Sequence, residues 1–203
     1  MIGGLEVPPT SPVVRRAKSD WPWIVGALIL VGISIAGIAQ SWTALSATID
    51  EPVHIWCGSE WLQNGMCKFD LQHPPLARMA VALGPYLKGL RSPSGAVPDT
   101  IVSTLHSAGT FRSNIAWARS GNLPFFVLAC IFVFLWARHV FGSSAAIGAV
   151  TLFATLPPIL GHAALATNDM ACCATVIMSL YAFMRCVENP SGQRLILLGT
   201  ALA

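Results

Sequence analysis

Long apolar runs alternate with short polar segments along this chain, and the alternation predicts membrane-spanning helices. The first run covers about residues 21–43 and contains no charged residue. A span needs about 20 mostly apolar residues, so we predict a polytopic, all-α transmembrane bundle. The runs that follow cover about 121–139, 141–161 and 169–187, and a last one begins at 194 and continues to 203.

The last run is too short to cross a bilayer. A helix that stops partway leaves backbone groups unpaired in lipid. We therefore expect the chain to be the N-terminal part of a longer protein.

The interval 44–120 is predicted to lie outside the membrane, and it contains two helical patterns. Apolar residues recur at helical spacing from Pro52 to Trp61, and again after the prolines at 74 and 75. Tryptophans in the first pattern suit a membrane interface, so both helices are expected to lie on the membrane surface. The Pro- and Gly-containing stretch from Arg91 to Asp99 predicts a flexible loop.

Composition supports the membrane class. The chain is 54% hydrophobic and 10% charged, against roughly 25% charged in soluble domains. Arg15, Arg16 and Lys18 precede the first run, and basic residues flanking a span stay cytoplasmic. We therefore expect a disordered cytoplasmic tail at 1–20 and an external loop at 44–120. The net charge of +3 is scattered, which gives no support for nucleic-acid binding.

Acidic residues mark the outer ends of two spans. Asp50 and Glu51 follow the first run, and Asp169 begins the fourth. Carboxylates at such places cost solvation energy and usually serve a site, so we predict an acidic pocket at the outer face. His54 lies four residues after Asp50, on the same helical face. The alternative is that Asp50 and Glu51 form a solvated helix cap.

A second local signal is the run His73-Pro74-Pro75-Leu76. Two prolines restrict the backbone at the start of the second surface helix, which would hold His73 and Arg78 near the membrane plane. The alternative is a stiff turn with no further role.

In their order along the chain, these features resemble the membrane glycosyltransferases of the GT-C fold, in particular the protein O-mannosyltransferase and aminoarabinose-transferase group. The resemblance covers about residues 21–187 and leaves the family's C-terminal half outside the chain. It rests on five elements: the acidic pair Asp50-Glu51, a surface helix with Trp and Gly at 56–65, the run His73-Pro74-Pro75-Leu76, Arg119 before the second span, and Asp169.

The resemblance implies an inverting transferase that takes a sugar from a polyprenyl-phosphate donor to a protein or glycolipid acceptor at the outer membrane face. Asp50 would be the base, Glu51 would orient the acceptor or support Asp50, and Asp169 would complete the acidic wall. The leaving phosphate needs cations, for which His73, Arg78 and Arg119 are the candidates, and His54 joins them as a substrate-binding residue. Arg119 is the preferred phosphate contact, and the alternative for it is an interfacial anchor.

The cysteines and the candidate cofactors complete the sequence picture. Cys57 and Cys67 face the oxidising side, where their spacing allows a disulfide, and the other four cysteines are expected to pack as small apolar groups. No zinc-site spacing occurs. Because Asn168 rather than a second acid precedes Asp169, no clear ligand set for a divalent cation is present, and whether the protein uses such a cation stays open. His162 is expected to bond a local carbonyl.

Two other function classes stay open. One is a transporter in which the three acids carry protons or cations, although transporters bind near mid-membrane. The other is a non-catalytic membrane fragment, because a truncated chain would not hold a whole active site.

Overall fold

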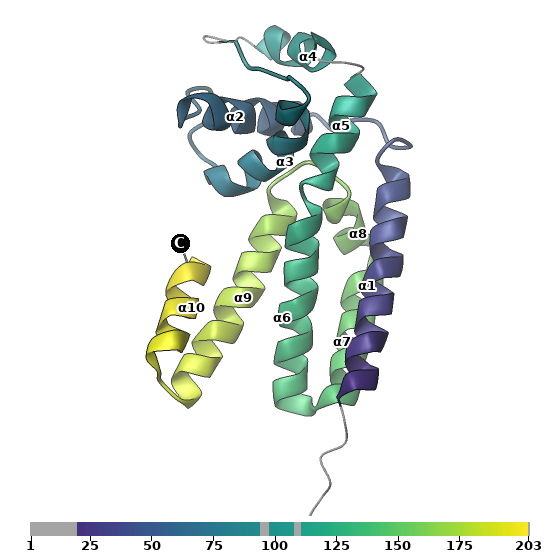
Figure 1. Cartoon of the computed structure of the whole chain (residues 1–203), viewed down its shortest axis with the longest axis vertical. Helices are drawn as coiled ribbons and strands as arrows, with labels where there is room; N and C mark the ends of the chain where they lie inside the picture. Colours follow the sequence, from purple (N-terminus) through teal and green to yellow (C-terminus); the bar gives the residue numbers. More distant parts are fainter. Residues whose placement is uncertain (1–19, 94–97, 108–110, 203) are drawn as a thin grey trace, which may run out of the picture.

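The computed structural model describes residues 20–93, 98–107 and 111–202, and these form a bundle of long helices with a group of shorter helices gathered at one end (Figure 1). The predicted all-α membrane bundle is confirmed. The expected tail, with Arg15, Arg16 and Lys18, lies outside the described residues apart from Asp20.

Three stretches of the described chain are long and apolar enough to cross a membrane. They are α1 (Trp21–Ser41), the continuous stretch of α5 (Phe111–Ser120) and α6 (Leu123–Phe141), and α9 (Asp169–Glu188). The chain is therefore an integral, multi-pass membrane protein. α10 (Gly192–Leu202) runs back along α9 (Figure 1).

The run expected as one span at 141–161 consists of two helices, which together are long and apolar enough to form one broken span or a re-entrant loop. α7 (Ser143–Thr155) and α8 (Pro157–Ala163) meet at an angle of 64°. Leu156 between them is extended, with φ −64° and ψ 124°. A residue before proline is pushed out of the helical region, and Pro157 has no N–H to continue the hydrogen-bond ladder, so the helix breaks here.

Small residues bring the bundle helices together. Ala129 on α6, Ala154 on α7 and Ala174 on α9 are buried in one cluster, and small side chains allow close helix contact in membranes. The hydroxyl of Ser34 on α1 donates to the carbonyl of Ala154 at 2.9 Å. Several larger apolar side chains of α1 are exposed, as Ile33 is at 65%, which suits contact with lipid.

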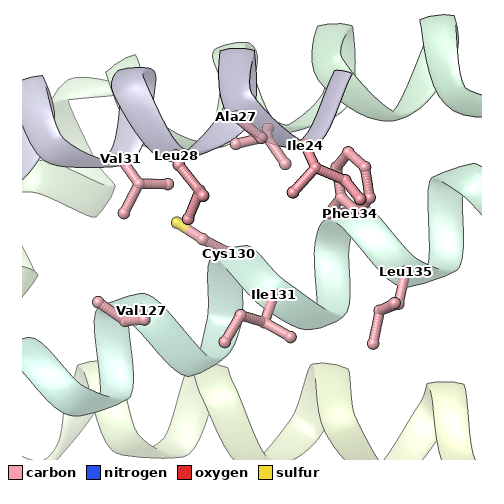
Figure 2. Close-up of a pocket in the computed structure, with 10 residues that line it drawn as sticks. Ile24, Ala27, Leu28, Val31, Val127, Cys130, Ile131, Phe134 and Leu135 are labelled. Atoms are coloured by element: carbon pink, nitrogen blue, oxygen red, sulfur yellow. The ribbon is translucent and has the colours of Figure 1, made fainter. Parts of the chain in front are cut away.

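An apolar hollow of about 570 Å³ lies between α1 and α6 (Figure 2). Side chains of the two helices face each other across it, and Val150 of α7 closes one part. The lining residues are Ile24, Ala27, Leu28, Val31, Val127, Cys130, Ile131, Phe134, Leu135 and Val150.

Four helices form the cap at the end of the bundle: α2 (Glu51–Asn64), α3 (Pro75–Leu87), α4 (Pro98–Ser107) and α5. The first two begin where the sequence predicted, each with a proline in its first turn. The loop expected at 91–99 is shorter, because α4 already begins at Pro98, and its residues 94–97 lie outside the described part.

Glycines allow the cap helices to touch through their backbones. A Cβ on Gly58 of α2 would lie 1.9 Å from the carbonyl oxygen of Arg78 on α3. A Cβ on Gly121, at the end of α5, would lie 2.2 Å from the carbonyl oxygen of Ala80. α3 is therefore fixed between α2 and α5.

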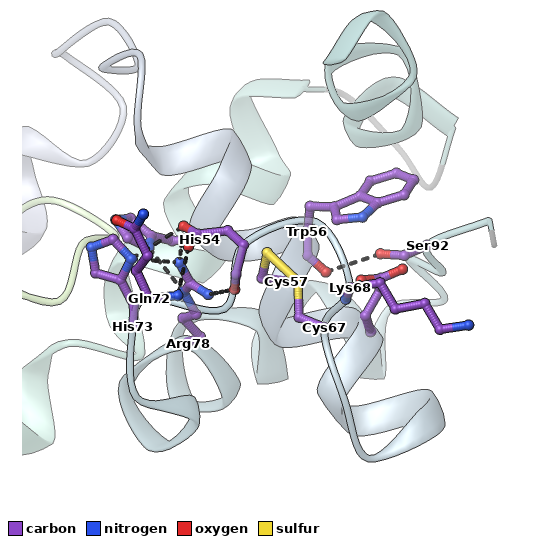
Figure 3. Close-up of a disulfide and its surroundings, with 11 residues drawn as sticks. His54, Trp56, Cys57, Cys67, Lys68, Gln72, His73, Arg78 and Ser92 are labelled. Carbon is purple, nitrogen blue, oxygen red and sulfur yellow. Dashed lines mark hydrogen bonds and ion pairs between the residues drawn. A yellow bond between two sulfur atoms is a disulfide. The ribbon is translucent and has the colours of Figure 1, made fainter. Parts of the chain in front are cut away.

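A disulfide joins Cys57 and Cys67, with their Cα atoms 5.1 Å apart (Figure 3), a normal separation for this bond. It ties α2 to the segment that leads to α3. Of the other four cysteines, Cys130 and Cys186 are buried as expected, whereas Cys173 is half-buried and Cys172 is exposed.

Candidate functional site

A polar hollow opens where the cap meets the beginning of α9. Its empty space is about 620 Å³, and its wall combines three parts of the chain that are far apart in sequence. The beginning of α2 supplies Asp50, Val53 and His54, the segment before α3 supplies Asp70 and His73, and the turn into α9 supplies Thr167, Asn168 and Asp169. Asp50, His54, His73 and Asp169, all singled out from the sequence, therefore lie together.

Asp50 is exposed at the N-cap position of α2. Its side chain makes no capping hydrogen bond, so the alternative that Asp50 serves as a helix cap is not supported. An exposed carboxylate at the wall of a hollow is placed to accept a proton from a bound molecule.

Glu51 differs sharply from its neighbour, because it is completely buried and ion-paired with Arg119. Its Oε1 lies 2.8 Å from Nε of Arg119, and its Oε2 lies 2.9 Å from Nη2. Burial raises the pKa of Glu51, but hydrogen bonds from Arg119, Ala166 and Thr48 outweigh this effect and hold the pKa below its ordinary value. Glu51 is therefore an anion locked inside the cap.

Arg119 is also completely buried, and its five N–H donors are all used inside the protein. Two bond Glu51, and the other three donate to the backbone oxygens of Trp42, Leu45 and Ser46 at 2.7–3.1 Å. The expected contact between Arg119 and a lipid phosphate does not fit this geometry. The interfacial-anchor alternative does not fit either, since the guanidinium faces the loop after α1.

The Glu51–Arg119 pair connects the elements that carry the hollow. The backbone N–H of Ala166, in the turn before α9, donates to Oε1 of Glu51 at 2.9 Å. The N–H of Thr48 donates to Oε2 at 2.8 Å. The pair thus fixes the distance between the segment that carries Asp50 and the turn that carries Asp169.

Arg78 lies under the opposite wall of the hollow and is completely buried. Its Nη1 donates to the carbonyl oxygen of Asp70 at 2.8 Å, and its Nη2 contacts both the Asp70 carboxylate and Nδ1 of His73, the latter at 2.9 Å. Its Nε lies 3.4 Å from Nδ1 of His54. Arg78 was expected to bind substrate directly, but here it acts behind His54, Asp70 and His73.

The titration of this cluster follows from its charges. Burial and the neighbouring Arg78 guanidinium lower the pKa of His54, so its imidazole is neutral at pH 7. The backbone N–H of Gln72, followed by Arg78, holds the pKa of Asp70 below its usual range. Asp70 is therefore ionised beside a buried guanidinium.

Asp169 stands at the first turn of α9 and is 58% exposed. Its Oδ2 accepts from the hydroxyl of Thr167 at 3.0 Å and lies 3.0 Å from Nδ1 of His162. His162 was expected to bond a local carbonyl, and its ring contacts this carboxylate instead. The reason is the break at Pro157, which turns α8 toward the start of α9.

Sequence reasoning missed Asp70, Thr167 and Asn168 in the wall of the hollow. Asp70 had a visible signal, because it stands three residues before His73 in a segment bounded by a cysteine and two prolines. Asn168 was noted only for not being acidic. Both polar atoms of its side chain are buried without a hydrogen-bond partner.

Within the described residues, no group of three or more histidine, cysteine or acidic side chains is arranged to hold a metal ion.

One comparison with known proteins gives a match. Residues 110–203 match the model of the dolichyl-phosphate-mannose-protein mannosyltransferase family. No curated protein and no solved structure matches the chain. The matched part begins just before α5, so it includes Arg119, the broken helix α7–α8 and the turn that carries Asp169.

Proposed function

We propose that this chain is part of a membrane glycosyltransferase of the GT-C type, as the family match at residues 110–203 supports, and that the protein transfers a sugar from a polyprenyl-phosphate donor to a hydroxyl of a protein or glycolipid acceptor. The observation that supports this most is the hollow in which Asp50 and Asp169 lie together. It stands at the end of the spans, where the phosphate of a membrane-anchored carrier can reach it.

The reaction needs a general base for the acceptor hydroxyl and a site that accommodates the phosphate leaving group. The Asp50 carboxylate takes the proton of the acceptor hydroxyl while the oxygen of that hydroxyl bonds to the anomeric carbon of the sugar. The bond between that carbon and the phosphate oxygen breaks on the opposite face, and its electron pair leaves with the phosphate. Attack and departure on opposite faces invert the anomeric carbon.

His73 is the candidate contact for the departing phosphate, because it lines the hollow and its side chain is 42% exposed. Arg78 supports it from behind through the 2.9 Å contact to Nδ1. Asp169, oriented by Thr167 and His162, faces the same space and is suited to bind hydroxyl groups of the sugar or the acceptor.

Glu51 and Arg119 receive a positioning role in this proposal. Their pair is buried and bonded to backbone on both sides of the hollow. They set where Asp50 and Asp169 stand, and neither contacts the substrate.

The cap is proposed to face outward. The opposite end of the bundle carries Arg138, His139, Arg185 and Arg194, and basic residues favour the cytoplasmic side. The hollow then lies at the outer face of the plasma membrane.

The test is Asp50→Asn in the full-length protein, assayed with a polyprenyl-phosphate sugar and an acceptor. Loss of a general base typically costs 10²–10⁴-fold in rate, so we expect kcat to fall by at least 100-fold. Glu188→Gln, at the other end of the bundle, is the matched control and should keep wild-type turnover. Retained turnover in Asp50→Asn would remove Asp50 as the base.

A transporter is the competing class. Ion uptake by the full-length protein in vesicles, abolished by Asp50→Asn in the absence of any sugar transfer, would favour it over the transferase.

A further inference from the structure

Asp70 is the one acid of the hollow that the proposed function does not use. Its carboxylate contacts the buried guanidinium of Arg78, and Oδ2 lies 3.1 Å from Nδ1 of His73. Its Oδ1 accepts from the backbone N–H of Gln72 at 3.0 Å. One side chain thus joins the arginine, the histidine and the backbone between them.

The segment around Asp70 is fixed at both ends. It begins at Cys67, whose disulfide to Cys57 anchors it to α2, and it ends at Pro74 and Pro75, which start α3 (Figure 3). Glu60 adds an anchor beside the disulfide, since its carboxylate accepts from the backbone N–H of Lys68 at 3.2 Å. A short segment held this way has little freedom to move Asp70 away from Arg78.

The charges explain why a carboxylate is needed here. Arg78 is completely buried, and Asp70 is its ion-pair partner. A buried guanidinium without a counter-ion is costly and would repel a second positive charge. His73 Nδ1 lies 2.9 Å from that guanidinium and 3.1 Å from the Asp70 carboxylate, so the orientation of the His73 ring depends on the Asp70–Arg78 pair. His54, whose ring centre is 5.3 Å from that of His73, adds no charge at pH 7.

We propose that Asp70 is a positioning residue for the donor phosphate: through Arg78 and the disulfide-anchored segment, it holds the His73 ring in the orientation in which that ring faces the phosphate in the hollow. This inference rests on the proposed function and deepens it.

The experiment compares Asp70→Asn and Asp70→Glu with wild type in the full-length protein, using a polyprenyl-phosphate sugar. Asparagine keeps the shape and can keep the contact to Gln72 but loses the charge. We expect the KM for the donor to rise at least 10-fold in Asp70→Asn while kcat changes by less than threefold. Asp70→Glu should recover part of the lost donor affinity.

Glu60→Gln is the matched control, because it also removes a carboxylate charge that binds backbone of the same segment. It should leave the donor KM unchanged. A Glu60→Gln variant with the same kinetic defect as Asp70→Asn would overturn the proposal, since the effect would then come from the segment as a whole. Wild-type donor KM in Asp70→Asn would overturn it directly.

A readout that needs no turnover separates this inference from the proposed function. The rate at which diethyl pyrocarbonate modifies His73, followed by mass spectrometry, reports how readily the imidazole leaves its contacts with Arg78 and Asp70. Asp70→Asn should raise that rate at least threefold near neutral pH, and Glu60→Gln should not. If the full-length protein transfers no sugar while His73 responds in this way, the proposed function fails and the positioning of His73 by Asp70 stands. An unchanged rate would reject the role of Asp70.

Discussion

The adjacent residues Asp50 and Glu51 lie in opposite environments. Asp50 is exposed to the hollow, whereas Glu51 is completely buried against Arg119. The helix geometry causes the division, because consecutive residues point about 100° apart around the axis. One carboxylate is therefore available for chemistry and the other for assembly.

This division predicts different effects on stability. Glu51→Gln leaves Arg119 buried without its counter-ion, which typically costs about 3–5 kcal/mol. Asp50→Asn changes an exposed side chain without a capping bond and should stay within about 0.5 kcal/mol of wild type. Thermal unfolding of the purified protein in detergent measures both. Equal melting temperatures for the two variants would contradict the buried pair.

His54 predicts a dependence of stability on pH. Burial, the Arg78 guanidinium and the neighbouring His73 lower the folded pKa of His54 from its ordinary value, and the carboxylates of Asp50 and Asp70 only partly oppose this shift. The unfolded chain therefore binds more protons, and stability rises with pH. This contribution is present above about pH 6.5 and is lost as the pH falls toward the folded pKa.

We therefore expect the melting temperature to drop between pH 7.5 and 5.5 in wild type. The drop should be smaller in His54→Gln, which cannot gain a proton. The same drop in both proteins would assign it to another group.

At the scale of elements, the contact between α2 and α3 depends on a single missing side chain. Gly58→Ala would place a methyl group 1.9 Å from the carbonyl oxygen of Arg78, so the helices must separate. Overpacking of this kind typically costs 1–3 kcal/mol, and the shift should also disturb Arg78 and weaken donor binding. Gly32→Ala is the control, because nothing lies within 4 Å of its Cβ position, and it should keep wild-type stability. Comparable stability in the two variants would argue against the close approach.

Local signals predicted some elements well and missed others for physical reasons. The starts of α2 and α3 were predictable because a proline in the first turn and helical apolar spacing are properties of the segment itself. The break at Pro157 was not, because the apolar run continues through it and only the backbone preference of Leu156 interrupts the helix. α4 and α5 were missed because their polar residues hide the helical pattern.

Some residues of the candidate site could likewise be identified from the sequence, and others could not. Asp50, His73 and Asp169 could be identified because each stands at a recognisable junction of an apolar run or a proline pair. The burial of Arg119 could not be identified, because its partner Glu51 is 68 residues away and its other acceptors are backbone oxygens. Asp70 was missed for a similar reason, because its ion pair with the buried Arg78 guanidinium forms only in the folded protein.

At the scale of the whole molecule, the charged ends of the bundle predict its orientation. In a variant whose four free cysteines are replaced by alanine, single cysteines at Leu87 and Phe141 would mark the two ends, because both side chains are about three-quarters exposed, at 76% and 75%. An impermeant thiol reagent applied to intact cells should label Leu87→Cys in the cap and leave Phe141→Cys unlabelled until the membrane is opened. The reverse pattern would place the hollow inside the cell and remove the proposed outer active face.

The contact between Glu51 and the backbone of Ala166 also has a consequence for biosynthesis. The two residues are 115 positions apart, and chains grow at about 5–20 residues per second, so roughly 6–23 s separate their synthesis. Arg119 emerges earlier and can neutralise the Glu51 carboxylate during that time. The nascent protein can therefore keep the Glu51 charge paired inside its cap, and the wall of the hollow is complete only when the ribosome has delivered the start of α9.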